Sequence, residues 1–198
     1  MEQAVVSGHQ LETSTGLDNR KLLMWVFLAS ECLFFGSLIA AYLLYRDRSV
    51  QGPYPSDLFD IPFTSVSAFV LLMSSVSMVL ALSSIQRGNR RGLQIWLFTT
   101  AVLGILFLSG QAYEFTVFHH EGLSLSRNMF GTTFFVLTGF HGAHVTVGVL
   151  ILLSLFTMTL QGKITQEESL PIELAGLYWH FVDIVWIVIF TLIYLIQP

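Results

Sequence analysis

Charged residues are scarce in this chain of 198 residues, because Asp, Glu, Lys and Arg make up only 11% of it. A soluble domain usually has about 25% of such residues. Hydrophobic residues reach 54%, they fall in runs too long for a water-soluble core, and the mean hydropathy is +0.68. The composition therefore predicts a membrane protein with several spans and excludes a large soluble domain.

Cysteine is almost missing, and there is no excess of positive charge. The single cysteine, Cys32, lies in the first apolar run, so it cannot form an intrachain disulfide or supply a multi-cysteine metal site. We interpret it as a small, soft packing residue. The net charge of −4 gives no reason to expect nucleic acid as a partner.

The predicted fold class is all-α, an integral membrane bundle of five transmembrane helices. A helix needs about 20 mostly apolar residues to cross a bilayer. A β-barrel would show short alternating segments instead. Five segments meet the helical requirement, at about 22–45, 63–85, 93–118, 129–160 and 172–196.

Turn-forming residues separate these spans and define a simple domain organisation. They occur at 52–55, 87–92, 121–122 and 161–163. Residues 1–20 form a polar N-terminal tail, and residues 21–198 form one transmembrane domain. The first apolar run is too long for the hydrophobic region of a signal peptide, so we expect it to be a retained span.

Basic residues predict the orientation, because cytoplasmic loops carry an excess of Lys and Arg. With the N-terminus in the cytoplasm and the C-terminus outside, the outer side carries Arg46, Arg48 and Arg127. The inner side then carries the larger set, namely Arg20, Lys21, Arg87, Arg90, Arg91 and Lys163.

Small residues recur where helices could approach closely in lipid. Gly36 and Ala40 lie four apart in the first span, and Gly139 and Ala143 do so in the fourth. Such spacing favours close helix packing, and hydroxyl side chains favour hydrogen bonds between helices. The second span contributes the hydroxyls of Ser65, Ser67, Ser74, Ser75 and Ser77. We interpret both features chiefly as holding the bundle together.

Three ionisable residues lie deep in the first and fifth spans, where each suggests a buried partner or a function. Glu31 is either a proton-exchanging or lipid-contacting carboxyl, or a neutral carboxyl hydrogen-bonded to a neighbouring helix. Asp183 lies at a similar depth. His180 is three residues before Asp183 and shares a helix face with it, which favours a helix-locking hydrogen-bonded pair over catalysis.

Two histidines and one glutamate complete the set of polar candidates. His141 and His144 share a face of the fourth span, and their spacing could hold a metal ion. No third ligand is evident nearby, so a structural role is favoured. Glu114 lies near the outer end of the third span, close to Tyr113 and His119.

Four stretches of the chain resemble a known family. The runs GLYWHFVDIVW at 176–186 and GTTFFVLTGFHGAHV at 131–145 look like signatures of subunit III of haem-copper cytochrome oxidases. SECLFF at 30–35 is similar to the family's membrane-glutamate motif, and GQAYE at 110–114 resembles the end of another helix. The four occur in family order, and the resemblance extends from about residue 18 to the C-terminus.

The resemblance implies an all-helical accessory subunit that packs on oxidase subunit I, beside subunit II and further subunits, in a bacterial inner membrane. Haem and copper would lie in the partner subunits and none on this chain, with phospholipid as a further ligand. The subunit would support proton uptake and sustained turnover. Glu31 would be the membrane carboxyl. The interhelical polar network would comprise Glu114, His141, His144, His180 and Asp183.

This sequence departs from longer family members in two respects. Those members have seven helices, with a lipid-holding cleft between the first two and the rest, and we expect this chain to lack the counterparts of the first two. The cleft is then absent, open to bulk lipid, or completed by another subunit. A basic residue near the inner end of the fourth helix is not clearly matched, since Lys163 lies further along.

Other functions compete with the cytochrome c oxidase interpretation. One is the quinol-oxidase branch, although 30–32 and 110–114 look more like the cytochrome c branch. Another relative accompanies some nitric oxide reductases. From a different class, a proton-coupled transporter could use Glu31, His141 and Asp183 as a relay, but transporters usually show internal repeats, which we do not find here. A membrane metalloenzyme is a weaker alternative.

Overall fold

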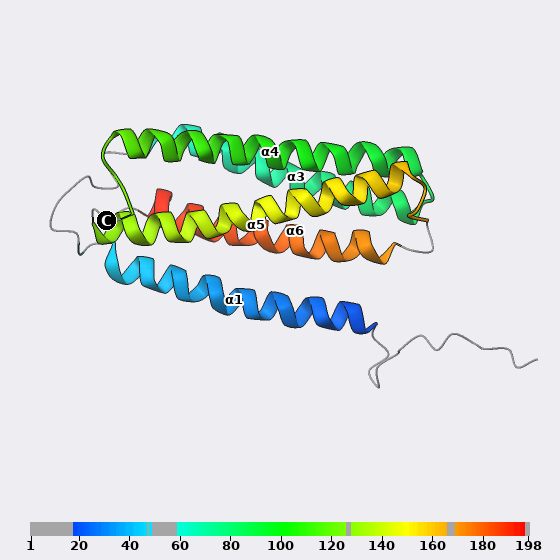
Figure 1. Cartoon of the computed structure of the whole chain (residues 1–198), viewed down its shortest axis with the longest axis horizontal. Helices are drawn as coiled ribbons and strands as arrows, with labels where there is room; N and C mark the ends of the chain where they lie inside the picture. Colours follow the sequence, from blue (N-terminus) through cyan, green and yellow to red (C-terminus); the bar gives the residue numbers. More distant parts are fainter. Residues whose placement is uncertain (1–17, 47, 49–58, 126–127, 166–168, 197–198) are drawn as a thin grey trace, which may run out of the picture.

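The computed structural model describes residues 18–46, 48, 59–125, 128–165 and 169–196. Within these ranges the chain forms long helices and no β-strand element (Figure 1). Five helices are long and apolar enough to cross a membrane, which confirms the predicted fold class. They are α1 (Asn19–Tyr45), α3 (Ile61–Gln86), α4 (Arg90–His120), α5 (Met129–Leu160) and α6 (Leu170–Phe190), which continues into the π-helical turn η1 (Thr191–Leu195).

The predicted spans agree with these helices to within about three residues at each end, and α5 has the predicted bounds. Most of the predicted N-terminal tail, the turn at 52–55 and Arg127 lie outside the described residues. The division into a tail and one membrane domain therefore stays a prediction.

Four of the helices begin at a side chain that accepts a hydrogen bond from the first turn. An Asp or Asn at this position satisfies a backbone N–H that has no partner inside the helix. The distances from side-chain oxygen to backbone nitrogen are 2.7 to 3.1 Å. These capping residues are Asp18, Asp60, Asn89 and Asn128.

Three helices end at a glycine in the left-handed region of backbone space. Gly88, Gly122 and Gly162 have φ of 71°, 88° and 75°, which a residue with a Cβ adopts only under strain. The residue after each glycine donates its N–H to a carbonyl five residues earlier, at 2.9 to 3.1 Å. This is the Schellman ending, and it explains why the predicted turns at 87–92, 121–122 and 161–163 stop the helices.

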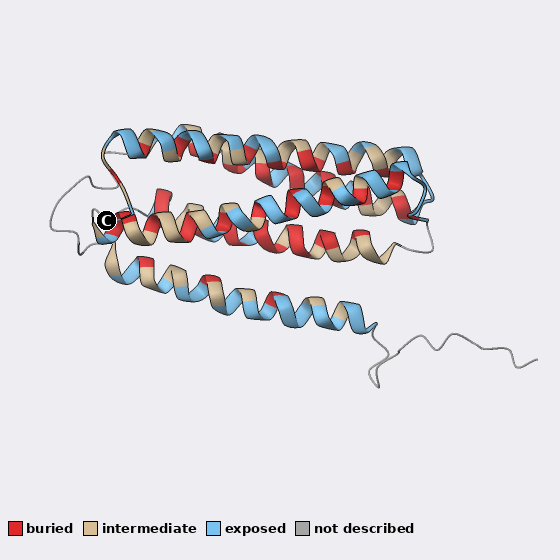
Figure 2. Ribbon diagram, viewed as in Figure 1, coloured by how far each residue is buried: buried red, intermediate tan, exposed pale blue. Residues whose placement is uncertain are grey.

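Helices α3, α4, α5 and α6 form an up-and-down bundle, and α1 lies along its outside, against α5 and α6 (Figure 1). Only 11% of the most apolar stretch of α1 is buried, against 33% to 50% for the other helices. Figure 2 shows the same contrast, with buried positions gathered inside the bundle and few on α1. Helix α1 is therefore the peripheral element of the fold.

Polar contacts hold α1 at both of its ends. At the first turn, Lys21 Nζ lies 2.7 Å from the Glu173 carboxylate of α6. At the last turn, Arg46 Nη1 donates to the backbone carbonyl of Ile196, 3.1 Å away. These contacts compensate in part for the small apolar surface that α1 buries.

The centre of the bundle is built around Trp179 of α6. A Cβ added to Gly104 of α4 or Gly148 of α5 would lie 2.7 or 2.8 Å from its ring, so only glycine allows this approach. By contrast, a Cβ on Gly36 or Gly139 would meet no atom within 4 Å. The predicted small pairs therefore do not mediate packing within this chain, because they lie on outer faces of α1 and α5.

Some of the serines of α3 form the predicted hydrogen bonds to other helices. Ser74 Oγ accepts from the Trp179 indole N–H at 2.9 Å, and Ser77 Oγ lies 2.7 Å from Thr100 Oγ1 of α4. Ser65 instead donates to the carbonyl of Ile61 in its own helix. Hydrogen bonds between helices are thus confirmed for the central serines of α3.

Candidate functional site

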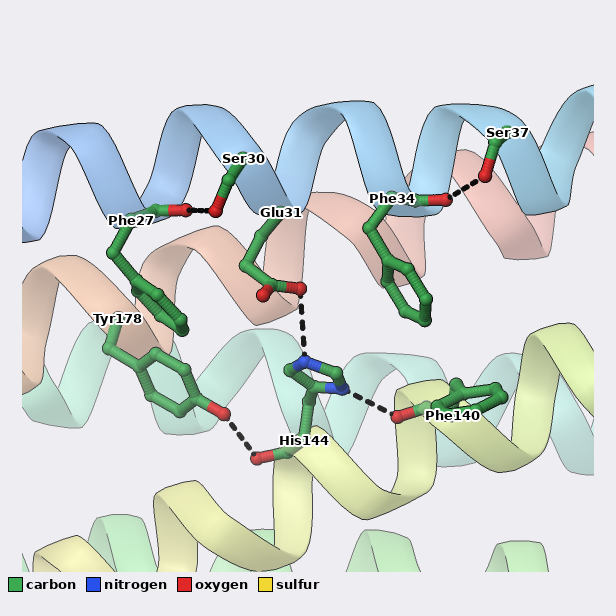
Figure 3. Close-up of polar contacts among 8 residues, drawn as sticks. All are labelled: Phe27, Ser30, Glu31, Phe34, Ser37, Phe140, His144 and Tyr178. Atoms are coloured by element: carbon green, nitrogen blue, oxygen red, sulfur yellow. Dashed lines mark hydrogen bonds and ion pairs between the residues drawn. The ribbon is translucent and has the colours of Figure 1, made fainter.

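Glu31 of α1 and His144 of α5 form a hydrogen-bonded pair between two helices. Glu31 Oε2 lies 3.2 Å from His144 Nε2 (Figure 3). Both residues lie near the middle of their helices, and Glu31 is about 18 Å from the start of α1 at 1.5 Å per residue. The pair therefore lies at a depth where lipid offers no hydrogen-bond partner.

The other ring nitrogen of His144 determines how this pair shares its protons. His144 Nδ1 lies 2.7 Å from the backbone carbonyl of Phe140, and a carbonyl can only accept. Nδ1 therefore carries a hydrogen. The bond between Nε2 and Glu31 then needs one further proton, held either by the carboxyl or by the ring. In both cases the pair has no net charge, which is the form that lipid tolerates best.

Aromatic side chains surround the Glu31–His144 pair and fix its position. The Tyr178 hydroxyl of α6 donates to the backbone carbonyl of His144 at 2.9 Å. The Phe35 ring meets the imidazole edge-on, with centroids 4.9 Å apart. Phe34 packs on Phe140 at 5.2 Å. Figure 3 shows the Glu31 and His144 side chains pointing toward each other from facing helices.

The Glu31–His144 pair lies at the boundary between the bundle and its surroundings. The Glu31 and His144 side chains are 17% and 19% exposed. One predicted role of Glu31 is a carboxyl hydrogen-bonded to a neighbouring helix, and the structure shows such a bond, to His144 of α5. Its remaining exposure keeps the carboxyl within reach of a lipid or a neighbouring subunit, and proton exchange stays a prediction.

Glu114 lies near the C-terminal end of α4 and links this helix to α3 and η1. Its carboxylate accepts from Thr64 Oγ1 of α3 at 2.8 Å and from the Tyr194 hydroxyl at 3.1 Å. Tyr194 lies in η1, where the π-helical turn shifts the register of the chain at the end of α6. Sequence reasoning found Glu114 but missed Thr64 and Tyr194, because neither residue type is unusual at the end of a span.

His180 and Asp183 do not form the predicted hydrogen-bonded pair. His180 Nδ1 lies 2.6 Å from Ser75 Oγ of α3, so the ring turns toward a neighbouring helix. Asp183 is buried beside Ser75, and its oxygens have no hydrogen-bond partner in the described part of the chain. A spacing of three residues brings two side chains to one face but does not make them bond to each other.

His141 is buried completely, and its ring stacks on that of Trp186 with the centroids 5.0 Å apart and the planes inclined by 24°. Phe107 meets the imidazole edge-on at 5.9 Å. His141 therefore does not join His144, which turns toward α1. Across the described ranges, no three His, Cys, Asp or Glu side chains are grouped in a way that could hold a metal ion.

Comparison with known proteins identifies the family of the chain. The family model for Cytochrome c oxidase subunit III matches residues 1–197. A cytochrome c oxidase subunit 3 from Synechocystis sp. is 41% identical over 183 residues, which cover 90% of this chain and 76% of that protein. A quinol oxidase subunit 3 from Bacillus spizizenii is 37% identical over 171 residues, which cover 86% and 84%.

A third relative, a cytochrome c oxidase subunit 3 from Bacillus sp. strain PS3, is 36% identical over 177 residues, covering 89% of this chain and 86% of its own. The relatives thus include subunits of both cytochrome c and quinol oxidases, and the match extends over nearly the whole chain. The chain belongs to the cytochrome c oxidase subunit III family.

Proposed function

We propose that this chain is an accessory subunit of a proton-pumping haem-copper terminal oxidase that takes electrons from cytochrome c. It packs directly on subunit I, with subunit II in the same complex, in a bacterial inner membrane. Haem and copper belong to the partner subunits. Phospholipid and the Glu31 carboxyl serve proton uptake and sustained turnover. The family match supports the assignment to an oxidase complex.

The observation that carries an accessory role is how the intramembrane polar groups are used. Glu31 bonds to His144, Glu114 to Thr64 and Tyr194, and His180 to Ser75, and each bond joins two helices. A redox centre needs ligands that converge on one point. These side chains instead connect α1 to α5, α3 to α4 and α3 to α6. Their arrangement is that of residues that hold a bundle together.

The Glu31–His144 pair supports the assignment of Glu31 as the membrane carboxyl. The bond between Glu31 and His144 needs one proton, on the carboxyl or on the ring, and the pair has no net charge in either case. The partial exposure of both side chains gives a second proton carrier or a lipid access to them. We infer that the pair supports proton uptake from its position beside subunit I.

The basic residues support an orientation with the N-terminus in the cytoplasm. The up-and-down order of the helices brings the start of α1, the α3–α4 turn and the end of α5 to one end of the bundle (Figure 1). This end holds most of the Lys and Arg residues, as the positive-inside rule requires of a cytoplasmic face.

Purification in mild detergent through a tag on this chain tests the proposal. We expect a complex that shows a haem spectrum, contains a large histidine-rich membrane subunit, and oxidises cytochrome c faster than quinol. Faster oxidation of quinol would move the chain to the quinol-oxidase branch. A colourless homo-oligomer, from cells in which the oxidase is made, would instead favour the transporter interpretation.

A further inference from the structure

A ring nitrogen of α6 lies at the surface of the bundle without a hydrogen-bond partner in the described ranges. Ser75 engages His180 Nδ1, whereas His180 Nε2 has no hydrogen-bond partner among the residues that the structure describes. His180 is half-buried and lies about 15 Å from the start of α6 at 1.5 Å per residue. Hydrocarbon cannot satisfy a ring nitrogen at this depth. The described residues therefore leave this nitrogen for a polar group that they do not supply.

His180 is the central member of a stripe along the outer face of α6. Its members are spaced three and four residues apart in alternation, which places them in one line on a helix. Ile184 and Ile187 are 59% and 44% exposed, and the other members are half-buried. We define the α6 stripe as Leu177, His180, Ile184, Ile187 and Thr191.

The neighbouring helices leave the α6 stripe uncovered. On one side of α6, Phe181 and Tyr178 pack against Phe35 and Phe27 of α1. On another side, Trp179 and His180 bond to the adjacent serines of α3. Helix α5 covers the inner side of α6. The stripe is therefore the outward side of α6, between α1 and α3.

The other polar pair at the surface has a different character. Glu31 and His144 are also partly exposed, but they are hydrogen-bonded to each other, and both ring nitrogens of His144 have a partner within the described residues. The α6 stripe carries a ring nitrogen for which the described residues supply no hydrogen-bond partner. The alternating spacing of the stripe is also that of two helices packed side by side, with side chains of one filling the gaps of the other.

We propose that the α6 stripe is the surface on which this chain contacts a transmembrane helix of another oxidase subunit. That helix carries a polar group opposite His180. If the Ser75 hydroxyl donates to Nδ1, the neutral ring carries its hydrogen on Nε2, so the group opposite is an acceptor oxygen. The inference rests on the proposed function, because it requires that the chain is part of an oxidase complex.

Photo-crosslinking in the whole complex tests the contact. A photoreactive phenylalanine analogue replaces Ile184 of the stripe or, as a control, Leu106 of α4, which is 55% exposed and also lies near mid-span. We expect Ile184 to yield an adduct with a different oxidase subunit and Leu106 to yield little. An adduct from Leu106 alone, an adduct of two copies of this chain, or no protein adduct from Ile184 would each overturn the proposal.

Substitution of His180 tests the polar contact separately. His180→Leu should lower the haem recovered per tagged chain by about three- to twenty-fold, the range given by hydrogen bonds between membrane helices. Ser75→Ala removes the bond within this chain but keeps Nε2, so its haem recovery should stay within about twofold of the wild type. Equal losses in the two variants, or no loss in His180→Leu, would contradict the proposal.

The wild-type preparation distinguishes a failure of the proposed function from a failure of the inference about the α6 stripe. If it carries no haem, the proposed function fails, and the α6 stripe has no oxidase partner to bind. If it carries haem but Ile184 does not crosslink to another subunit, only the inference about the α6 stripe fails.

Discussion

Arg90, the first residue of α4, donates to the backbone carbonyl of Thr159 near the end of α5, from Nε at 3.2 Å and from Nη2 at 2.6 Å. Gln94 Nε2 also donates to this carbonyl, at 3.3 Å. The last carbonyls of a helix have no partner within it, and a cation there also favours the helix dipole. This contact joins the α3–α4 turn to the end of α5.

We predict that Arg90→Ala lowers the free energy of unfolding by about 1 kcal/mol, since it removes charge-assisted bonds at a partly exposed site. Arg91→Ala is the matched control, because Arg91 is exposed and makes no recorded side-chain contact within the described chain. The measurement is SDS-induced unfolding of the purified chain in mixed micelles, followed by circular dichroism. Equal effects of the two variants would show that only charge matters here.

A second prediction compares two glycines of α5. Gly148→Ala should destabilise the chain by about 1–3 kcal/mol, because its Cβ would lie 2.8 Å from the Trp179 ring. Gly139→Ala should be neutral or stabilising by up to about 1 kcal/mol, because that site is open and alanine favours helix. The same unfolding assay measures both. A larger loss for Gly139→Ala would contradict the packing described here.

A third prediction concerns Glu31. Glu31→Gln should leave initial oxygen reduction nearly intact in the assembled complex, since the amide can still donate to His144 Nε2 and no redox ligand changes. Glu31→Leu should weaken the contact of α1 with α5 by about 0.6–1.7 kcal/mol, because the imidazole loses its partner. Oxygen uptake and the haem spectrum of the purified complex measure the effect of Glu31→Gln, and the unfolding assay measures that of Glu31→Leu. Loss of haem or of the initial rate in Glu31→Gln would refute the first expectation.

A fourth prediction concerns the bond between Glu114 and Tyr194. A double-mutant cycle with Glu114→Gln and Tyr194→Phe should give a coupling of about 0.6–1.7 kcal/mol in the unfolding assay. Tyr113→Phe replaces Tyr194→Phe in the control cycle, because Tyr113 is exposed and packs against Phe63 instead. We expect a coupling near zero in that control. Equal couplings would mean that the effect is not specific to the bond.

The helices could be predicted closely from the sequence, because the length and polarity of each span are local properties. The bounds of α5 agree because Asn128 caps its start and Gly162 follows its end. The faces could not be assigned in the same way. Gly36 and Gly139 have the spacing of packing residues, yet they lie on outer faces, since spacing does not tell which side of a helix meets its neighbours.

The candidate site was predicted as a set of residues but not as a set of pairs. Glu31 and His144 were both identified, but their contact depends on how α1 packs against α5 and not on sequence spacing. The spacing of His180 and Asp183 predicts a hydrogen bond within one helix, whereas in the structure His180 is hydrogen-bonded to Ser75 of α3. A hydroxyl is too common to be recognised as a partner before the helices are placed.

The separation of Glu31 and His144 along the chain has a consequence for how the protein is made. The two residues are 113 positions apart, so at a synthesis rate of about 5–20 residues per second Glu31 leaves the ribosome about 6–23 s before His144. During this interval the Glu31 side chain has no imidazole to bond. The bond between Glu31 and His144 therefore forms only when α5 enters the membrane and packs against α1.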